Sequence, residues 1–187
     1  LRRQLSKDFI KEVREHHKAL PTDLLLDLWK SPQREFQYAA IDLSDKYRRV
    51  TSPADLPLFE RLITEKSWWD TVDALASHHV GAVFKNYPDS RAPWIPKWLD
   101  SGNIWLQRTC IIFQLGYKLD TDWNSMTSAI EYCLPSKESF IQKAIGWALR
   151  EYGKHQPAIV VEYVRDHESE LPALSKREAL KRITRGK

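Results

Sequence analysis

Two tryptophans and one aspartate stand at spacings that suit chemistry on a cationic substrate. In the segment that starts at Ser67, Trp69 and Asp73 are four residues apart, so an α-helix would place them one turn apart. Trp147 belongs to a second helical segment, between Lys143 and Arg150. Aromatic faces attract cations, and a carboxylate stabilises positive charge that develops as a bond breaks. These residues are therefore the first candidates for a catalytic site.

Basic residues accompany this aspartate and predict a polyanionic partner. Arg108, Lys143 and Arg150 suit phosphate groups, and the net charge of +4 with a pI of about 9.0 fits nucleic acid. A carboxylate in such a groove repels phosphate, but it suits the breakage of an N-glycosidic bond, which creates an oxocarbenium-like sugar. An N3- or N7-alkylated purine is itself cationic and leaves readily. Arg108 would keep Asp73 ionised and hold a phosphate.

A sequence period indicates how these residues are positioned. Gln37, Gln107 and Gln142 occur in similar settings, 70 and 35 residues apart, and the skipped repeat places Val72 at the equivalent position. A period of 35 residues with two helices per repeat predicts an all-α fold, an α-solenoid of HEAT-like repeats. The residues that follow these positions should then line one concave surface: Tyr38, Asp73, Arg108 and Lys143.

Proline and capping residues divide the chain into short helices. No linker separates them, so we expect a single domain over residues 1–187. The expected helices are 2–18, 22–30, 33–47, 54–65, 68–86 with a break near Gly81, 94–100, 103–117, 122–133, 137–154, 156–168 and 175–184. Ser67 and Ser175 resemble the first residues of capping boxes.

Helical spacing predicts which side chains in two of these helices are buried. In 68–86 the spacing favours a buried stripe of Trp68, Val72, Leu75 and His79, and a more polar side of Trp69, Asp73 and Ser77. In 137–154 it favours core positions at Phe140, Ala144, Ile145 and Ala148, and a basic stripe of Lys143, Gly146, Trp147 and Arg150. Gly146 would serve either a partner's backbone or tight helix packing.

Several function classes are not expected. No apolar stretch approaches the ~20 residues of a membrane span, and the start has no hydrophobic core of a signal peptide. Neither the two cysteines nor the six histidines show metal-ligand spacing, so we expect no metal, no cofactor and reduced core thiols. We expect a cytoplasmic monomer that joins the nucleoid when it is bound to DNA. Because residue 1 is Leu1, we expect a fragment of a longer protein.

Four segments resemble the AlkD-like DNA alkylation-repair glycosylases, and together they cover most of the chain: Ser67–Asp73, Asn103–Arg108, Phe140–Tyr152 and Leu174–Ala179. The resemblance implies a right-handed superhelix of HEAT-like repeats that takes part in base excision repair. It would excise 3-methyladenine and 7-methylguanine from duplex DNA without flipping the base into a deep pocket. It also implies that N-terminal helices of the family, which contact DNA, precede Leu1.

The resemblance also assigns roles to single residues. Asp73 matches the catalytic aspartate, Trp69 and Trp147 match the tryptophans that flank the lesion, and Arg108 matches the active-site arginine. Arg150 matches an arginine that contacts DNA. Since no lysine is placed for a Schiff base, we expect water as the nucleophile and no strand cleavage.

A non-catalytic HEAT-repeat scaffold that binds DNA or protein is the alternative. In that case Asp73 is a surface charge and the tryptophans form a protein-binding hot spot. The presence of Asp73 together with Trp69 and Trp147 favours the enzyme. The salt dependence of DNA affinity separates a DNA-binding protein from a protein scaffold.

Overall fold

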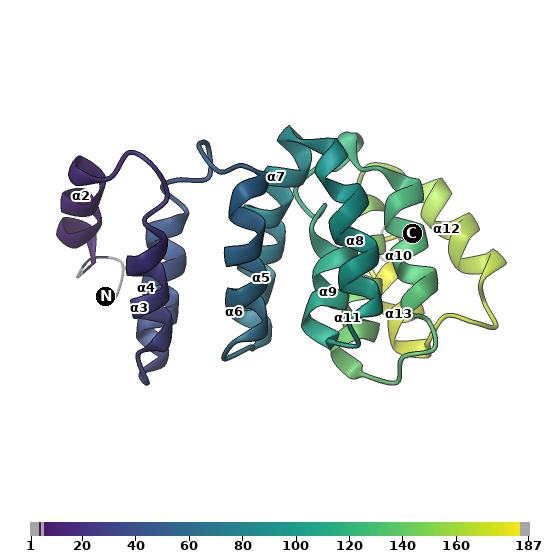
Figure 1. The fold of residues 1–187 in the computed structure, drawn as a ribbon. Coiled ribbons are helices and arrows are strands. Elements are labelled where there is room, and N and C mark those ends of the chain that lie inside the picture. Colours follow the sequence, from purple (N-terminus) through teal and green to yellow (C-terminus); the bar gives the residue numbers. More distant parts are fainter. Residues whose placement is uncertain (1–3, 5, 184–187) are drawn as a thin grey trace. The chain divides into compact units, whose positions relative to one another are not determined.

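The structure, a computed structural model, describes Gln4 and residues 6–183, and these residues are helical or irregular, without strands. They form two compact units, one that ends at Arg91 and one that begins at Ala92. The all-α fold class predicted from the sequence is confirmed (Figure 1).

The first unit stacks helices in two layers. The helices with described bounds begin with α2 (Lys7–His16). Two pairs follow it, α3 (Thr22–Lys30) with α4 (Arg34–Ser44) and α5 (Leu56–Thr64) with α6 (Trp69–Ala74). The last helix continues as a π-helical segment, η2 (Leu75–Val80), and α7 (Gly81–Asn86), and the 3₁₀ turns are η1 (Pro53–Asp55) and η3 (Pro88–Ser90). α3 contacts α5 and α4 contacts α6, so equivalent helices of successive pairs lie side by side.

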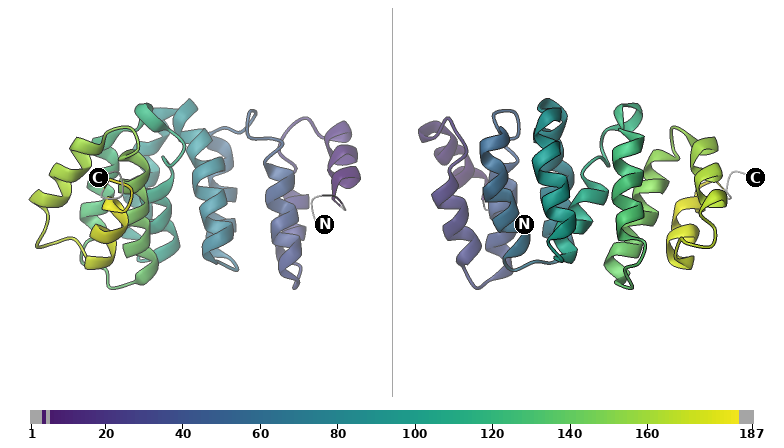
Figure 2. Two further views of the ribbon diagram at one scale, coloured as in Figure 1. Left: turned by 180° about the vertical axis from the view of Figure 1, so that it is seen from behind. Right: turned by 45° about the vertical axis from the view of Figure 1, so that its right-hand side comes forward.

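The second unit repeats this plan. Its elements are α8 (Arg91–Asp100), α9 (Ile104–Ile112), η4 (Lys118–Asp120), α10 (Trp123–Cys133), α11 (Ser139–Tyr152), α12 (Pro157–Asp166) and α13 (Ala173–Leu180). α11 packs between α9 and α13, and Figure 2 shows α11 and α13 side by side. This two-layer stacking of helical pairs is the arrangement that the 35-residue period predicts.

The three glutamines that show the period each link the two helices of a pair. The side-chain amides of Gln37, Gln107 and Gln142 each donate to a main-chain carbonyl at or after the end of the preceding helix, at Trp29 (2.8 Å), Leu99 (2.9 Å) and Ser136 (3.5 Å). Helix ends leave carbonyls without partners in the helix, so in these three pairs a glutamine satisfies a group that would otherwise be unpaired, whereas the α5–α6 pair has Val72 at this position. The period therefore has a structural cause.

Successive pairs are joined by hydrogen bonds between residues about one period apart. In the first unit the Trp29 indole N–H donates to the carbonyl of Glu65 at 2.8 Å. In the second unit the Ser175 hydroxyl donates to the carbonyl of Gln142 at 2.8 Å. Ser175 is buried inside α13, which begins at Ala173, so the predicted helix start at Ser175 is wrong.

The predicted break near Gly81 is also wrong. Gly81 has helical backbone angles, and the helix widens before it into the π-helical segment Leu75–Val80. The fully buried His79 lies in this segment, with Nε2 2.7 Å from the Ser44 hydroxyl oxygen. Burial lowers the pKa of His79 to about 4, although nearby Asp45 opposes the shift. A neutral imidazole is therefore built into the core beside the π-turn.

Candidate nucleic-acid interface and catalytic residues

Trp69 and Asp73 share one helix in the first unit. Trp69 is the first residue of α6 and is 48% exposed, as predicted, and Asp73 follows one turn later and is half-buried. Trp68 is exposed to the same extent, so its predicted place in the buried stripe is wrong. The reason is local, because Trp68 has extended backbone angles and lies outside the helix. The other predicted members of that stripe, Val72, Leu75 and His79, are fully buried.

A polar network fixes the first turn of this helix. Asp70 accepts hydrogen bonds from the Arg34 guanidinium, at 2.5 Å, and from the Tyr38 hydroxyl, and both donors come from α4. Arg34 also donates to the Thr71 hydroxyl at 3.0 Å. Although partial burial opposes it, hydrogen bonding by Tyr38 and Arg34 holds the pKa of Asp70 below its usual value. The network anchors the turn that carries Trp69.

The sequence predicted Tyr38 in the row with Asp73, but its hydroxyl contacts Asp70, one turn earlier. Arg34 and Asp70 were not predicted as site residues from the sequence. They are 36 residues apart, close to the period, and that spacing is the signal that could have identified the pair.

The helix changes its winding directly after Asp73. The π-helical segment begins at Leu75, and the Ser77 hydroxyl donates to the carbonyl of Asp73 at 2.7 Å. π-turns occur often at functional sites because they alter the direction of neighbouring side chains. The polar network around Asp70 therefore holds the helix just before Asp73, and the π-helical segment begins just after it.

In the second unit Arg108 is a buried residue of α9. Only 4% of it is exposed, and its guanidinium donates to the carbonyl of Phe140 at the start of α11. Lys143 lies one turn further along α11, exposed, with its ammonium 5.6 Å from the centre of the Phe140 ring. Like Tyr38, Arg108 therefore contacts the first turn of a helix that lies one repeat further along the chain.

Two of the four residues in the predicted basic stripe of α11, Gly146 and Arg150, lie against α13. Trp147 is partly exposed, whereas Arg150 is 23% exposed and forms an ion pair with Glu178 of α13. Ala144, Ile145 and Ala148 are buried as predicted. The sequence predicted a capping box at Ser175, with Glu178 as its acidic residue, but not the ion pair of Glu178 with Arg150.

α13 approaches α11 closely at Gly146. A Cβ atom added there would lie 2.7 Å from the Cβ of Glu178 and 2.9 Å from the carbonyl oxygen of Ser175. Of the two roles considered for this glycine, tight helix packing is the one that the structure shows.

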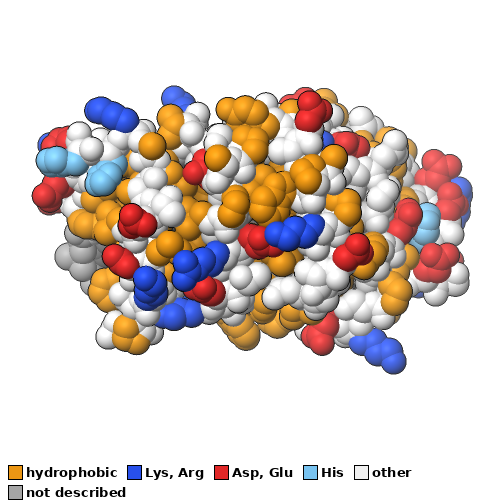
Figure 3. Space-filling view, in the orientation of Figure 1, with side chains coloured by type: hydrophobic (Ala, Val, Ile, Leu, Met, Phe, Trp, Pro, Cys, Tyr) orange, Lys and Arg blue, Asp and Glu red, His pale blue; other side chains and the backbone are white. Residues whose placement is uncertain are grey.

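Many other cations of the first unit are engaged by neighbouring groups. Figure 3 shows Lys and Arg side chains interspersed with Asp and Glu near the α3–α4 and α5–α6 connections. Lys30 pairs with Asp27 at 3.4 Å and Arg61 with Glu65 at 2.7 Å. Lys66 donates to the carbonyl of Lys30 at 2.7 Å. Exposed pairs of this kind contribute little to stability, but they lower the charge available to a polyanion.

The described residues hold no cluster of three His, Cys, Asp or Glu side chains that could bind a metal ion. Cys110 and Cys133 are buried free thiols, and burial raises the pKa of Cys133 to about 11. Within the same part of the chain, no helix has both the length and the apolar character needed to cross a membrane.

Comparisons with known proteins identify the family. A family model described as DNA alkylation repair enzyme matches residues 1–183. A solved structure, described as a predicted DNA alkylation repair enzyme from Enterococcus faecalis, is 32% identical with a TM-score of 0.87. The match covers 96% of this chain and 83% of that one. A search of curated proteins gives no significant match. The chain belongs to the DNA alkylation repair enzyme family.

Proposed function

We propose that this protein is an AlkD-like monofunctional DNA glycosylase, which hydrolyses the N-glycosidic bond of 3-methyladenine and 7-methylguanine in duplex DNA. The observation that carries the proposal is that Trp69, whose ring is exposed, and Asp73 lie one turn apart on α6. The family supplies DNA with an alkylated base as the class of substrate. Such a base is cationic, and an aromatic face with a carboxylate suits it.

In the proposed reaction, the bond between C1′ and the purine nitrogen breaks, and its electron pair neutralises the cationic base as the base leaves. The sugar gains oxocarbenium character, which the Asp73 carboxylate would stabilise. A water molecule positioned by the same carboxylate adds to C1′ and gives up one proton to the carboxylate or to solvent. Because water is the nucleophile, the DNA strand stays intact.

The remaining residues would hold the lesion and its strand. Trp69 and Trp147 would flank the modified nucleotide on an open face, without a deep base-binding pocket. Lys143 and Arg150 would contact phosphates. Arg108 is buried and bound to the Phe140 carbonyl, so we assign it a fixed positive charge rather than a mobile contact with DNA. Both units would serve one substrate, so residues 1–187 would act as a single, monomeric glycosylase domain.

The test is release of free base from duplex DNA that contains one 7-methylguanine, with the product identified by mass. Asp73→Asn should lower the single-turnover rate by about 100-fold or more, since it removes charge where positive charge develops. Asp89→Asn, on an exposed turn of the same unit, is the matched control and should leave the rate unchanged. Equal base release by wild type and Asp73→Asn would refute the role of Asp73. Salt-dependent DNA binding without base release would favour the non-catalytic scaffold.

A further inference from the structure

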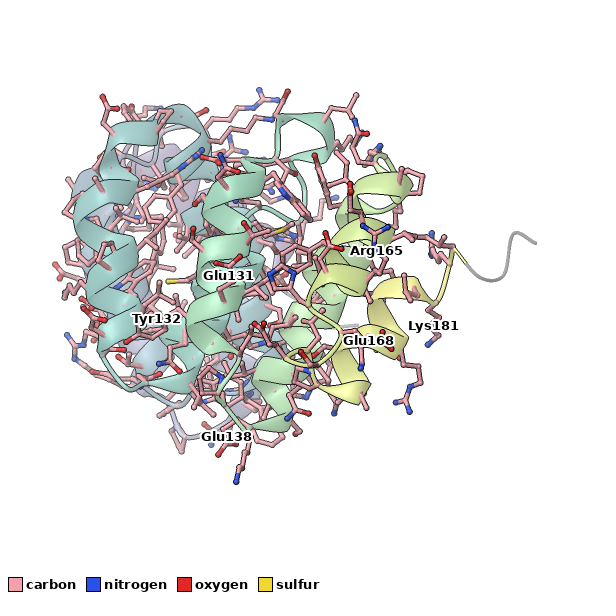
Figure 4. The ribbon with its side chains drawn as sticks, turned by 90° about the vertical axis from the view of Figure 1, so that its right-hand side faces the viewer. Glu131, Tyr132, Glu138, Arg165, Glu168 and Lys181 are labelled. Atoms are coloured by element: carbon pink, nitrogen blue, oxygen red, sulfur yellow. The ribbon has the colours of Figure 1, made fainter. Side chains whose placement is uncertain are left out.

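A charged cavity lies at the end of α13 in the second unit. It has a volume of ≈ 320 Å³ and is lined by four side chains, Arg150 from α11 and Glu178, Lys181 and Arg182 from the end of α13. All four side chains are ionic. Figure 4 shows Lys181 beside the end of α13, with its side chain directed outwards. The cavity is therefore a site for a charged ligand rather than an apolar one.

The charges in this cavity do not balance. Glu178 pairs with Arg150 and lies 3.5 Å from Lys181, so one carboxylate orders two cations. With Arg182 the cavity holds three cations and one carboxylate, an excess of two positive charges. Although desolvation opposes it, Lys181 and Arg150 hold the pKa of Glu178 below its usual value, so it is ionised at neutral pH. The guanidinium and ammonium groups are thus held close together and remain partly exposed, at 23% for Arg150 and 48% for Lys181.

The neighbouring surface of the same unit has the opposite charge. α12 and the turn after it carry four acidic residues, Glu162, Asp166, Glu168 and Glu170. The only arginine among them, Arg165, pairs with Asp166 at 2.9 Å and with Glu162 at 3.5 Å. Figure 4 shows Arg165 and Glu168 on this side. A polyanion is repelled by this surface and attracted by the end of α13.

We propose that Arg150, Glu178, Lys181 and Arg182 form a phosphate-binding cluster, and that the second unit presents the end of α13, not α12, to the DNA backbone. The inference rests on the proposed function for the identity of the polyanion. Phosphate oxygens accept hydrogen bonds from guanidinium and ammonium groups, and arginine matches their geometry in a bidentate way. Glu178 is a positioning residue, because it orders Arg150 and Lys181 before DNA binds.

The test measures binding to an undamaged fluorescent duplex by anisotropy over a range of salt concentrations. The logarithm of affinity changes with the logarithm of salt by about 0.9 per phosphate contact, so Lys181→Gln/Arg182→Gln should reduce the slope by roughly 1.8. Arg165→Gln removes one positive charge on the acidic side and is the matched control, with an unchanged slope. Thermal melting of each variant checks that it is folded.

Glu178→Gln gives a second, opposite prediction. The amide oxygen can still accept from Arg150, but one negative charge is lost, so binding should become tighter at every salt concentration. Slopes that are unchanged in Lys181→Gln/Arg182→Gln, or lowered equally in Arg165→Gln, would overturn the proposal. The binding assay does not depend on base release. If the wild type releases no base but the variants show the expected salt dependence, the glycosylase activity is contradicted and the phosphate-binding cluster is not. A wild-type slope near zero overturns both.

Discussion

Replacing Gly146 by alanine tests the packing of α11 against α13. The new Cβ would meet the Cβ of Glu178 at 2.7 Å and the Ser175 carbonyl oxygen at 2.9 Å, and neither atom can rotate away. Ordinary carbon contacts need roughly 3.5 Å or more, so α13 must move by roughly half an ångström to an ångström. That shift strains the hydrogen bond from Ser175 to the Gln142 carbonyl, now 2.8 Å, and the Arg150–Glu178 ion pair.

The expected net cost is up to about 2 kcal/mol of the free energy of unfolding. Overpacking of a helix interface costs about 1–3 kcal/mol, and alanine recovers up to ~1 kcal/mol of helix propensity. Urea denaturation followed by circular dichroism measures the difference. Gly116→Ala is the matched control, because a Cβ there has no neighbour within 4 Å, and it should be neutral or slightly stabilising. If Gly146→Ala is more stable than wild type, as helix propensity alone predicts, the inferred close contact is wrong.

Three further perturbations test the fold and the site. His79 is neutral in the core with a pKa lowered to about 4, so the unfolded chain binds more protons between pH 6.5 and 4. Up to about 3 kcal/mol of stability should be lost as the pH falls through this window; His79→Gln should weaken that dependence, and an identical pH profile in urea denaturation would contradict it. Gln37→Leu leaves carbonyls of the α3–α4 connection unpaired and should cost about 1–3 kcal/mol, more than Gln142→Leu, whose bond is 3.5 Å long; equal unfolding energies would argue against the linking role. Tyr38→Phe removes a donor to Asp70 and should cost about 1 kcal/mol, and the loss should disappear in an Asp70→Ala background, which has no side-chain acceptor; additive losses in this double-mutant cycle would exclude the network.

Repetition made much of the fold predictable. The 35-residue spacing of Gln37, Gln107 and Gln142 predicted paired helices. In the structure each glutamine donates to a main-chain carbonyl near the end of the preceding helix. Helical spacing also predicted an exposed Trp69 and a core of Ala144, Ile145 and Ala148. These predictions succeed because they depend on the geometry of a single helix or of one repeated connection.

Other features could not be predicted because they depend on where a helix starts or how it is wound. Trp68 has the spacing of a buried residue, but the helix begins one residue later and leaves it exposed. The π-helical segment after Asp73 replaces the break expected at Gly81, because the chain keeps helical angles through the glycine. One residue in the starting point or one wider turn changes the direction of every side chain that follows.

The sequence by itself determined the all-α fold, the period and the residue types available for chemistry, since these follow from spacing and composition. Tertiary structure decided the partners: Asp70 for Arg34 and Tyr38, the Phe140 carbonyl for Arg108, and Glu178 for Arg150. Those contacts join residues 28 to 36 positions apart. The register between packed helices depends on the sizes of the side chains at their contact, and Gly146 lets α13 come close to α11. That register decides which charged side chains meet.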